Sequence, residues 1–475
     1  MADNEVGSSS SLAKTIAGYA LMIAGTGGAF MAIRSFGVHL SAPVLEHVEG
    51  PAAARAGADT LMHVLLAMIV VILAARLLGA AFKFIEQPPV IGEVIAGIAL
   101  GPSLLGRIAP GLTKALLPAT VAPFLSVIAQ VGVILFMFLV GLELDTSRLR
   151  QKAHAFVAIS HASIIAPFLI GSTMALWLYP RLSSSDVPFT TFALFVGISL
   201  SVTAFPVLAR ILTDRGIHKT RLGIVALSCA AVDDVTAWCI LAFIVSLAGA
   251  GASGSSAIST LALSAVYVAA MILVVRPIAA RFVRKQEIVK ALPQSAIAVT
   301  FVALLASALV TELIGIHAIF GAFLLGAIIP HDSRLANELT KRLEDVVVVF
   351  LLPAYFAFTG MRTQIGLVSG AAEWGICLAI IVAASAGKFG GTLVAGKLTG
   401  LGTRDAASLG ILMNTRGLME LIVLNLGLDL HVISPTLFAM LVLMAVITTM
   451  ATTPILHLLQ RGGLGRELAG EAAPG

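Results

Sequence analysis

Two adjacent carboxylates stand in the middle of an apolar run that is long enough to cross a bilayer. Asp233 and Asp234 lie at the centre of 222–249, where an ionisable side chain costs about 2.5 to 3.5 kcal/mol to insert. Neighbouring residues of a helix point about 100° apart, so one carboxylate can face a water-filled cavity while the other faces another helix. Because desolvation disfavours a bare carboxylate, the chemistry expected of such a group is reversible binding of a proton or a small cation.

Lys388 is the expected counter-charge for this pair. It lies about ten residues from the nearer end of the apolar run 374–399, which is too deep for its side chain to snorkel to the interface. Gly387 and the glycines that follow Lys388 allow another helix to approach closely. A buried lysine is also a usable proton carrier, so Lys388 is a second candidate for proton release.

Two further apolar runs are interrupted at mid-depth. In 190–212, hydroxyl residues precede Pro206, which removes a helical hydrogen bond and frees a carbonyl group. In 405–430, four residues break the apolar pattern: Asn414-Thr415-Arg416-Gly417. The two runs lie seven spans apart and therefore cross in opposite directions, each as the middle of three helices. This pattern predicts inverted repeats with two discontinuous helices that form an ion site near the bilayer midplane.

The composition determines which elements must position these residues. Of the 475 residues, 58% are hydrophobic and only 12% are charged, whereas a soluble domain carries roughly 25% charged residues. This excludes a cytosolic enzyme, a nucleic-acid-binding module and a disordered scaffold. The net charge of +5 fits basic residues that collect in cytoplasmic loops. The sequence therefore predicts an all-α polytopic membrane protein.

Apolar windows of near-spanning length predict about 13 or 14 transmembrane helices. With the N-terminus in the cytoplasm, 20 of the 30 Lys and Arg residues fall in cytoplasmic loops and tails, and five fall in outer loops. The first window is an extra helix or a signal peptide. The predicted windows are 15–36, 61–85, 89–108, 124–145, 155–179, 190–212, 222–249, 257–280, 294–315, 317–330, 344–361, 374–399, 405–430 and 435–458.

Several motifs carry a family resemblance. They are Gly92-Glu93-Val94-Ile95-Ala96-Gly97-Ile98, Phe138-Leu139-Val140-Gly141-Leu142-Glu143-Leu144-Asp145, Ser201-Val202-Thr203-Ala204-Phe205-Pro206-Val207-Leu208-Ala209-Arg210, Asp233-Asp234, Gly387-Lys388 and Met413-Asn414-Thr415-Arg416-Gly417-Leu418-Met419-Glu420-Leu421-Ile422-Val423. Together they resemble the monovalent cation:proton antiporter family two, in particular its branch of plant and fungal cation/proton exchangers. The resemblance covers about 61–458.

The resemblance implies a sodium/proton antiporter fold and a homodimer. The antiporter membrane domain would comprise 61–458, with ion-binding core helices in about 124–249 and 374–458 and dimerisation or linker helices in the remainder. Outside the resemblance, the span pattern predicts an extra helix and an outer loop in 1–60 and a short cytoplasmic tail in 459–475. The protein is then expected in a bacterial-type inner (cell) membrane.

The resemblance also implies roles for the site residues. Asp234 would bind a monovalent cation, Na⁺ or K⁺, and a proton in alternation, while Asp233 pairs with Lys388. Thr203 and the freed backbone at Ala204, Phe205 and Pro206 would supply oxygens. Asn414, Thr415 and Arg416 would lie at the opposite crossover, where Arg416 compensates acidic groups or helix dipoles. The exchange would need no cofactor and no enzymatic step.

The three alternatives are a related transporter and two proteins of other classes. Glutathione-gated potassium-efflux members of the family resemble this core, but they usually carry Gln-Asp in place of Asp233-Asp234 and continue into a nucleotide-binding domain. An intramembrane aspartyl protease needs acids from two helices that converge on a water molecule. A passive cation channel needs a selectivity filter, and Lys388 would obstruct it. We therefore expect a self-contained exchanger, whose choice of Na⁺ or K⁺, stoichiometry, direction and pH set-point the sequence leaves open.

Overall fold

All regular secondary structure in the part of the chain that the structure describes is helical. The computed structural model describes residues 51–143, 153–184, 187–217, 220–249, 254–287 and 293–460. The chain divides into two units, Met1–Asp59 and Thr60–Gly475. Of the first unit only 51–59 are described, as the start of helix α2 (Pro51–Phe84). The predicted span 15–36 and most of the predicted tail therefore lie outside the described residues.

The helices of the second unit match the predicted number of spans. Eleven helices are long and apolar enough to cross a membrane, and one bent pair brings the number to twelve. With the shorter apolar helix α15, thirteen described elements correspond to the thirteen windows predicted after residue 60. The helical fold follows because backbone polar groups in lipid must be satisfied within their own segment.

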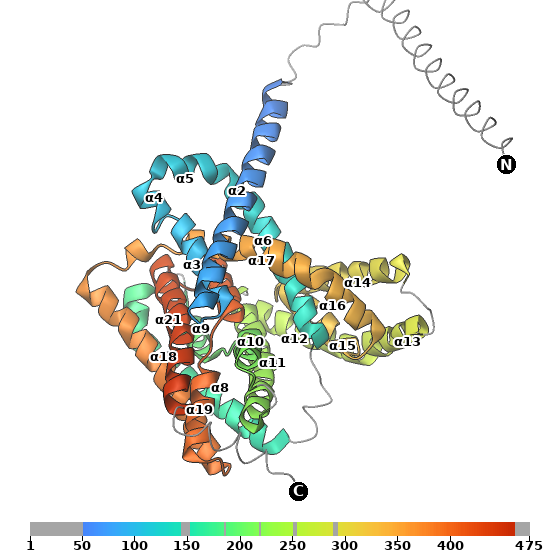
Figure 1. Ribbon diagram of the computed structural model, residues 1–475. Coiled ribbons are helices and arrows are strands. Elements are labelled where there is room, and N and C mark those ends of the chain that lie inside the picture. Colours follow the sequence, from blue (N-terminus) through green and yellow to red (C-terminus); the bar gives the residue numbers. More distant parts are fainter. Residues whose placement is uncertain are drawn as a thin grey trace, which may run out of the picture. The chain divides into compact units, whose positions relative to one another are not determined.

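The elements follow one another in this order (Figure 1). After α2 come α3 (Pro89–Leu100), α4 (Leu105–Ile108), α5 (Pro110–Leu116), η1 (Ala119–Val121), α6 (Ala122–Glu143), α8 (Ala153–Leu182), α9 (Phe189–Ser201), α10 (Phe205–Asp214), α11 (Arg221–Gly249), α12 (Gly254–Ala270), η2 (Met271–Val275), α13 (Arg276–Glu287), α14 (Gln294–Ile314), α15 (Ala318–Ile328), α16 (Arg334–Asp345), η3 (Val346–Leu351), α17 (Leu352–Arg362), η4 (Ile365–Leu367), α18 (Gly370–Leu398), α19 (Thr403–Met413), α20 (Leu418–Asp429) and α21 (Pro435–Gln460).

One span begins earlier than the sequence pattern indicates. The predicted window 344–361 is part of a longer span, Arg334–Leu367. Its charged first part, α16, buries Leu335, Ala336 and Leu339 along one face and exposes its polar residues on the other. A hydropathy window takes an amphipathic segment of this kind for a loop, because the charged residues of the exposed face outweigh the apolar residues of the packed face.

The described helices after residue 60 form two packed groups. In the first, which we call the crossover bundle, α8 packs against α9, α11 and α18, and α18 packs against α19 and α21. In the second, which we call the outer bundle, α3 packs against α17, and α15 packs against α6 and α14. The helix α6, which begins the predicted core range 124–249, thus packs with the outer bundle, against α15 and α17.

The two predicted interruptions are real breaks in the helices. Residues 202–204 separate α9 from α10, and residues 414–417 separate α19 from α20, which are bent by 45°. Pro206 lies in the first turn of α10, where a missing N–H costs nothing, so it starts the second half-helix. Gly417 is packed so closely against Val207 that a Cβ atom would collide with this side chain.

Candidate ion-binding site

The two breaks meet at the centre of the crossover bundle. The backbone N–H of Ala204 donates a hydrogen bond to the Thr415 carbonyl oxygen at 3.0 Å. The hydroxyl of Thr203 lies 3.0 Å from the carbonyl oxygen of Met413, the last residue of α19. Two segments about 210 positions apart are therefore joined by one main-chain hydrogen bond and one side-chain contact to the main chain. The structure brings together the predicted crossover residues Ala204, Phe205, Pro206, Asn414 and Thr415.

Asp233 is buried and fully bonded. Its Oδ2 lies 3.0 Å from the Lys388 ammonium and accepts a hydrogen bond from Ser163 Oγ at 2.7 Å. Ser160 donates to its Oδ1. The Thr203 hydroxyl lies 2.9 Å from Oδ2 and accepts a hydrogen bond from Lys388. Both oxygens of Asp233 thus have partners, as a buried charge requires.

Ser160 and Ser163 are site residues that the sequence reasoning missed. They come from α8, which packs against α11 and α18, and both side chains are fully buried. Their spacing of three residues places them on one face of a helix. Two hydroxyls on one face of an apolar helix were therefore the available signal, but nothing local indicates which of the neighbouring helices this face contacts.

Asp234 has a different environment from Asp233. It is 3% exposed, and its Oδ1 has no hydrogen-bond partner among the described residues. The backbone N–H of Phe205, in the first turn of α10, donates a hydrogen bond to its carboxylate. A helix N-terminus carries partial positive charge and favours an anion. The carboxylate is thus held at the start of a half-helix with one oxygen unused.

The formal charges around the two acids do not balance. With all three groups ionised, Asp233 and Asp234 carry two negative charges and Lys388 carries one positive charge. Lys388 is fully buried and directly bonded to Asp233, so the excess negative charge resides on Asp234. An isolated buried carboxylate is strongly disfavoured, and a bound proton or cation removes this cost.

Arg416 occupies the other side of the crossing. Its guanidinium donates to the carbonyl oxygens of Ser199 (2.7 Å) and Leu200 (2.5 Å), near the end of α9. It also donates to Glu420 Oε2 at 2.9 Å. Both side chains are fully buried. Arg416 therefore compensates the negative end of α9, whose last carbonyls have no helical partners.

Asn414 and Thr415 add polar atoms between these two clusters. The side-chain amide of Asn414 lies 3.4 Å from Ser385 Oγ. The other polar atom of Asn414, Oδ1, and the Thr415 hydroxyl are buried without a hydrogen-bond partner in the described part of the chain. The contacts of Thr203 run to Asp233, Lys388 and Met413, so its hydroxyl lies on the Lys388 side of the acid pair.

Two broken helices that meet at their breaks, beside a buried acid with an unused oxygen, are typical of secondary active transporters. The family model described as "Sodium/hydrogen exchanger, transmembrane" matches residues 67–459. The chain belongs to this family. It is a multi-pass membrane protein and a secondary active cation/proton antiporter, which confirms the function predicted from the motifs.

Curated relatives cover most of the chain. It is 45% identical over 398 residues to the Na⁺/H⁺ antiporter NhaS4 of Synechocystis, across 84% of this chain and 97% of the relative. It is 40% identical to cation/H⁺ antiporter 20 of Arabidopsis thaliana (81% and 47%) and 34% identical to K⁺/H⁺ antiporter 1 of Saccharomyces cerevisiae (82% and 45%). The chain therefore spans about half the length of these plant and yeast relatives.

A solved structure has the same fold. The sodium proton antiporter MjNhaP1 from Methanocaldococcus jannaschii matches with a TM-score of 0.59 over 85% of this chain and 98% of that chain, at 13% sequence identity. This likeness confirms the predicted antiporter fold.

Proposed function

We propose that Asp234 is the group that binds the transported cation and the proton in alternation. The observation that supports this proposal is that Asp234 carries the uncompensated negative charge of the site. Its carboxylate is buried and has an unused Oδ1. One such oxygen can be satisfied by a proton or by a metal ion, and either ion excludes the other. This competition couples the two fluxes without any cofactor.

The same geometry suggests which other groups take part. Asp233 and Lys388 form a bonded pair beside the site, and the hydroxyl of Thr203 positions this pair. The unpaired polar atoms of Asn414 and Thr415 are candidates for additional oxygen ligands. Monovalent cations are held by oxygen atoms, and backbone carbonyls freed by broken helices commonly supply them.

Alternating exposure requires the crossover bundle to move against the outer bundle. We place α8–α11 and α18–α21 in the moving unit, since these helices pack mainly on one another. This division leaves α6 with the outer bundle, because α6 contacts α15 and α17. It differs from the range 124–249 expected from the sequence only in that helix.

A homodimer and a cell-membrane location complete the proposal. The span Ala262–Glu287 is the least covered of all described spans, with 6% of its apolar window buried. This face is large enough to contact either lipid or a second copy. Crosslinking of single cysteines introduced along α12 tests the dimer.

The similarity to a cyanobacterial antiporter supports a bacterial-type inner membrane.

The substitution Asp234→Asn tests the site. Purified protein in proteoliposomes would be given an imposed pH gradient, and Na⁺, K⁺ or Li⁺ added in turn. We expect wild-type protein to dissipate the gradient with at least one of these cations, and Asp234→Asn to leave only the background leak. The reason is that an amide cannot exchange a proton for a cation.

A matched control keeps this result specific. Asp332 lies in the loop after α15, and its side chain is 81% exposed, so Asp332→Asn should exchange at the wild-type rate. Size-exclusion chromatography shows whether each variant is folded. Full exchange by folded Asp234→Asn protein would reject the assignment of Asp234 and leave antiport by this chain intact. Single-channel currents in planar bilayers would instead indicate a pore.

A further inference from the structure

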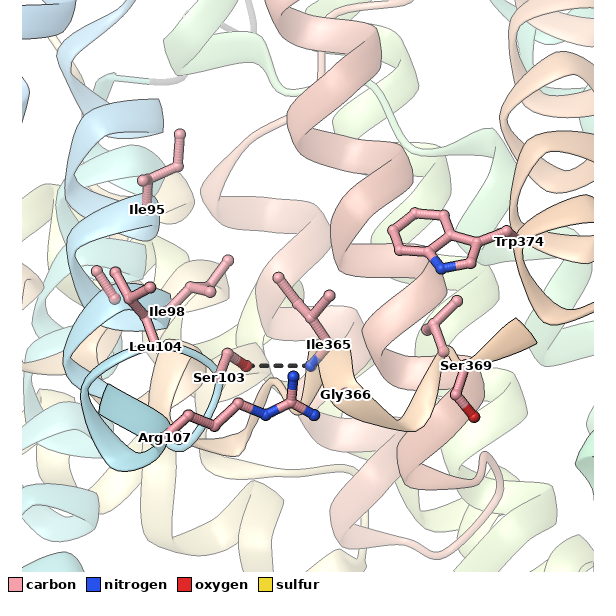
Figure 2. Close-up of a pocket in the computed structure, with 11 residues that line it drawn as sticks. Ile95, Ile98, Ser103, Leu104, Arg107, Ile365, Gly366, Ser369 and Trp374 are labelled. Carbon is pink, nitrogen blue, oxygen red and sulfur yellow. Dashed lines mark hydrogen bonds between the residues drawn. The ribbon is translucent and has the colours of Figure 1, made fainter. Parts of the chain in front are cut away.

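A cavity of about 510 Å³ opens between α3 and α18, away from the crossing of the broken helices. It lies where the span Pro89–Ile108 ends and the span Gly370–Leu398 begins, which places it at one membrane–water interface. In Figure 2, Ile95 and Ile98 lie on one side, Trp374 lies on the other, and Arg107 reaches toward Gly366. By the charge bias of the loops, this end of the spans is the one poor in Lys and Arg.

Arg107 brings an uncommitted positive charge to the cavity. Its side chain is exposed, and no hydrogen bond or ion pair links its guanidinium to the described residues. Gly366 lies against this guanidinium, and a Cβ atom at this position would collide with it. Arg181, at the same end of the spans, is different, because it donates to the Trp177 carbonyl at 2.6 Å and lies over the Trp177 ring.

The remaining walls are apolar and firmly held. Ile95, Ile98 and Leu104 line one side, and Trp374, which is 47% exposed, lines the other. The Ser103 hydroxyl accepts a hydrogen bond from the Ile365 N–H at 3.0 Å and donates to the Thr363 carbonyl. These two bonds fix the loop that forms the floor. Tryptophan favours the interface, where its ring contacts both acyl chains and headgroups.

We propose that this cavity binds one anionic phospholipid. Its phosphate pairs with Arg107, since guanidinium and phosphate form strong charge-assisted hydrogen bonds. Its acyl chain lies along Ile95, Ile98 and Trp374, where a free phosphate ion would make no use of the apolar walls. A basic group beside an apolar cleft between transmembrane helices offers a partner to each part of a phospholipid, the phosphate and the acyl chain.

The position of the cavity connects this lipid to the transport cycle. Ile98 belongs to α3 of the outer bundle and Arg107 to α4, which contacts α3, whereas Trp374 belongs to α18 of the crossover bundle. A lipid held between them contacts both groups, so it stabilises the conformation in which the cavity exists. This consequence rests on the proposed movement of the bundles, but binding itself does not, and binding is what the experiment measures.

Native mass spectrometry of the full chain, released from detergent with added phosphatidylglycerol or phosphatidylcholine, tests the site. We expect retention of one phosphatidylglycerol per chain and about a fivefold loss of affinity in Arg107→Gln, the factor that one cation contributes to anionic-lipid binding. Arg181→Gln is the matched control and should bind as wild type. Ala99→Phe, which keeps the charge and fills the cavity, should also reduce retention.

Several results would overturn the proposal. Equal phosphatidylglycerol retention by wild type and Arg107→Gln would remove the role of the cation. Equal retention of phosphatidylcholine would show that negative charge is not recognised. Displacement of the lipid by millimolar inorganic phosphate would point to a small-anion site. Should Arg107→Gln fail to fold, undiminished binding by Ala99→Phe would exclude the cavity.

Discussion

The two charged clusters at the crossing of the broken helices differ in how their charges are balanced. Arg416 and Glu420 form one pair of opposite charges, and Arg416 also donates to two carbonyls of α9, while Arg416 Nε and Glu420 Oε1 have no hydrogen-bond partner among the described residues. The other cluster places one lysine beside two carboxylates, so one of its negative charges, that of Asp234, has no opposite charge paired with it in the described part of the chain. Removing one partner of a balanced buried pair is costly, because it leaves the other charge unpaired, whereas an unbalanced cluster has a place for an ion.

The clusters also differ in the sequence separation of their members. Arg416 and Glu420 are four residues apart, with Arg416 in the break and Glu420 in the first turn of α20. Lys388 and Asp233 are 155 positions apart, and Ser160 and Asp233 are 73 apart. The arginine pair joins near neighbours in the chain, whereas the acid cluster exists only after α8, α11, α18 and the break before α10 have packed together. Stability and activity should therefore respond differently to substitutions in the two clusters.

Arg416→Met should have the largest effect on stability. It leaves the Glu420 carboxylate and two carbonyl groups buried without a partner, and breaking a buried pair in this way costs about 3 to 5 kcal/mol. Thermal melting in detergent, followed by tryptophan fluorescence, measures the loss. The double variant Arg416→Met/Glu420→Gln should recover part of it. A wild-type melting curve for the single variant would contradict the balanced-pair interpretation.

Lys388→Met should cost somewhat less, about 3 kcal/mol, since three hydroxyls still bond Asp233 after the ammonium is lost. The added substitution Asp233→Asn removes the buried negative charge that has lost its partner. The melting temperature of the double variant should therefore be closer to that of the wild type. We also expect Lys388→Met to change the charge moved per cycle, as measured by currents on solid-supported membranes. Unchanged stability together with unchanged currents would argue against the pair.

Ser163→Ala should have the smallest effect of the three. It removes one hydrogen bond to a charged group, a loss of about 1.5 kcal/mol, while Ser160, Thr203 and Lys388 still bond Asp233. The matched control is Ser264→Ala, whose hydroxyl bonds only the carbonyl of Thr260 in its own helix. Melting temperatures of the two variants provide the comparison. An equal or larger fall in melting temperature for Ser264→Ala would show that the hydrogen bond from Ser163 to Asp233 contributes no more to stability than an ordinary bond within one helix.

Local chemistry was enough to predict the spans, the breaks and the buried charges. Whether a residue lies in lipid depends on its own transfer free energy and that of its near neighbours. The windows around Asp233, Lys388 and Pro206 could therefore be recognised from the sequence alone. The same reasoning failed at α16. There the charged residues of the exposed face lower the mean hydropathy of the window, although the other face is packed against the protein.

Only the tertiary structure decided which partner each polar group has. Nothing near Asp233 in the chain distinguishes it from Asp234, yet rotation by about 100° along α11 directs one toward Lys388, Ser160 and Ser163 and leaves the other with an unused oxygen. The packing of α6 against α15 and the cavity beside Arg107 likewise depend on contacts between distant segments. The cost of insertion into lipid is additive along the chain, whereas helix pairing depends on the shape and polarity of whole faces.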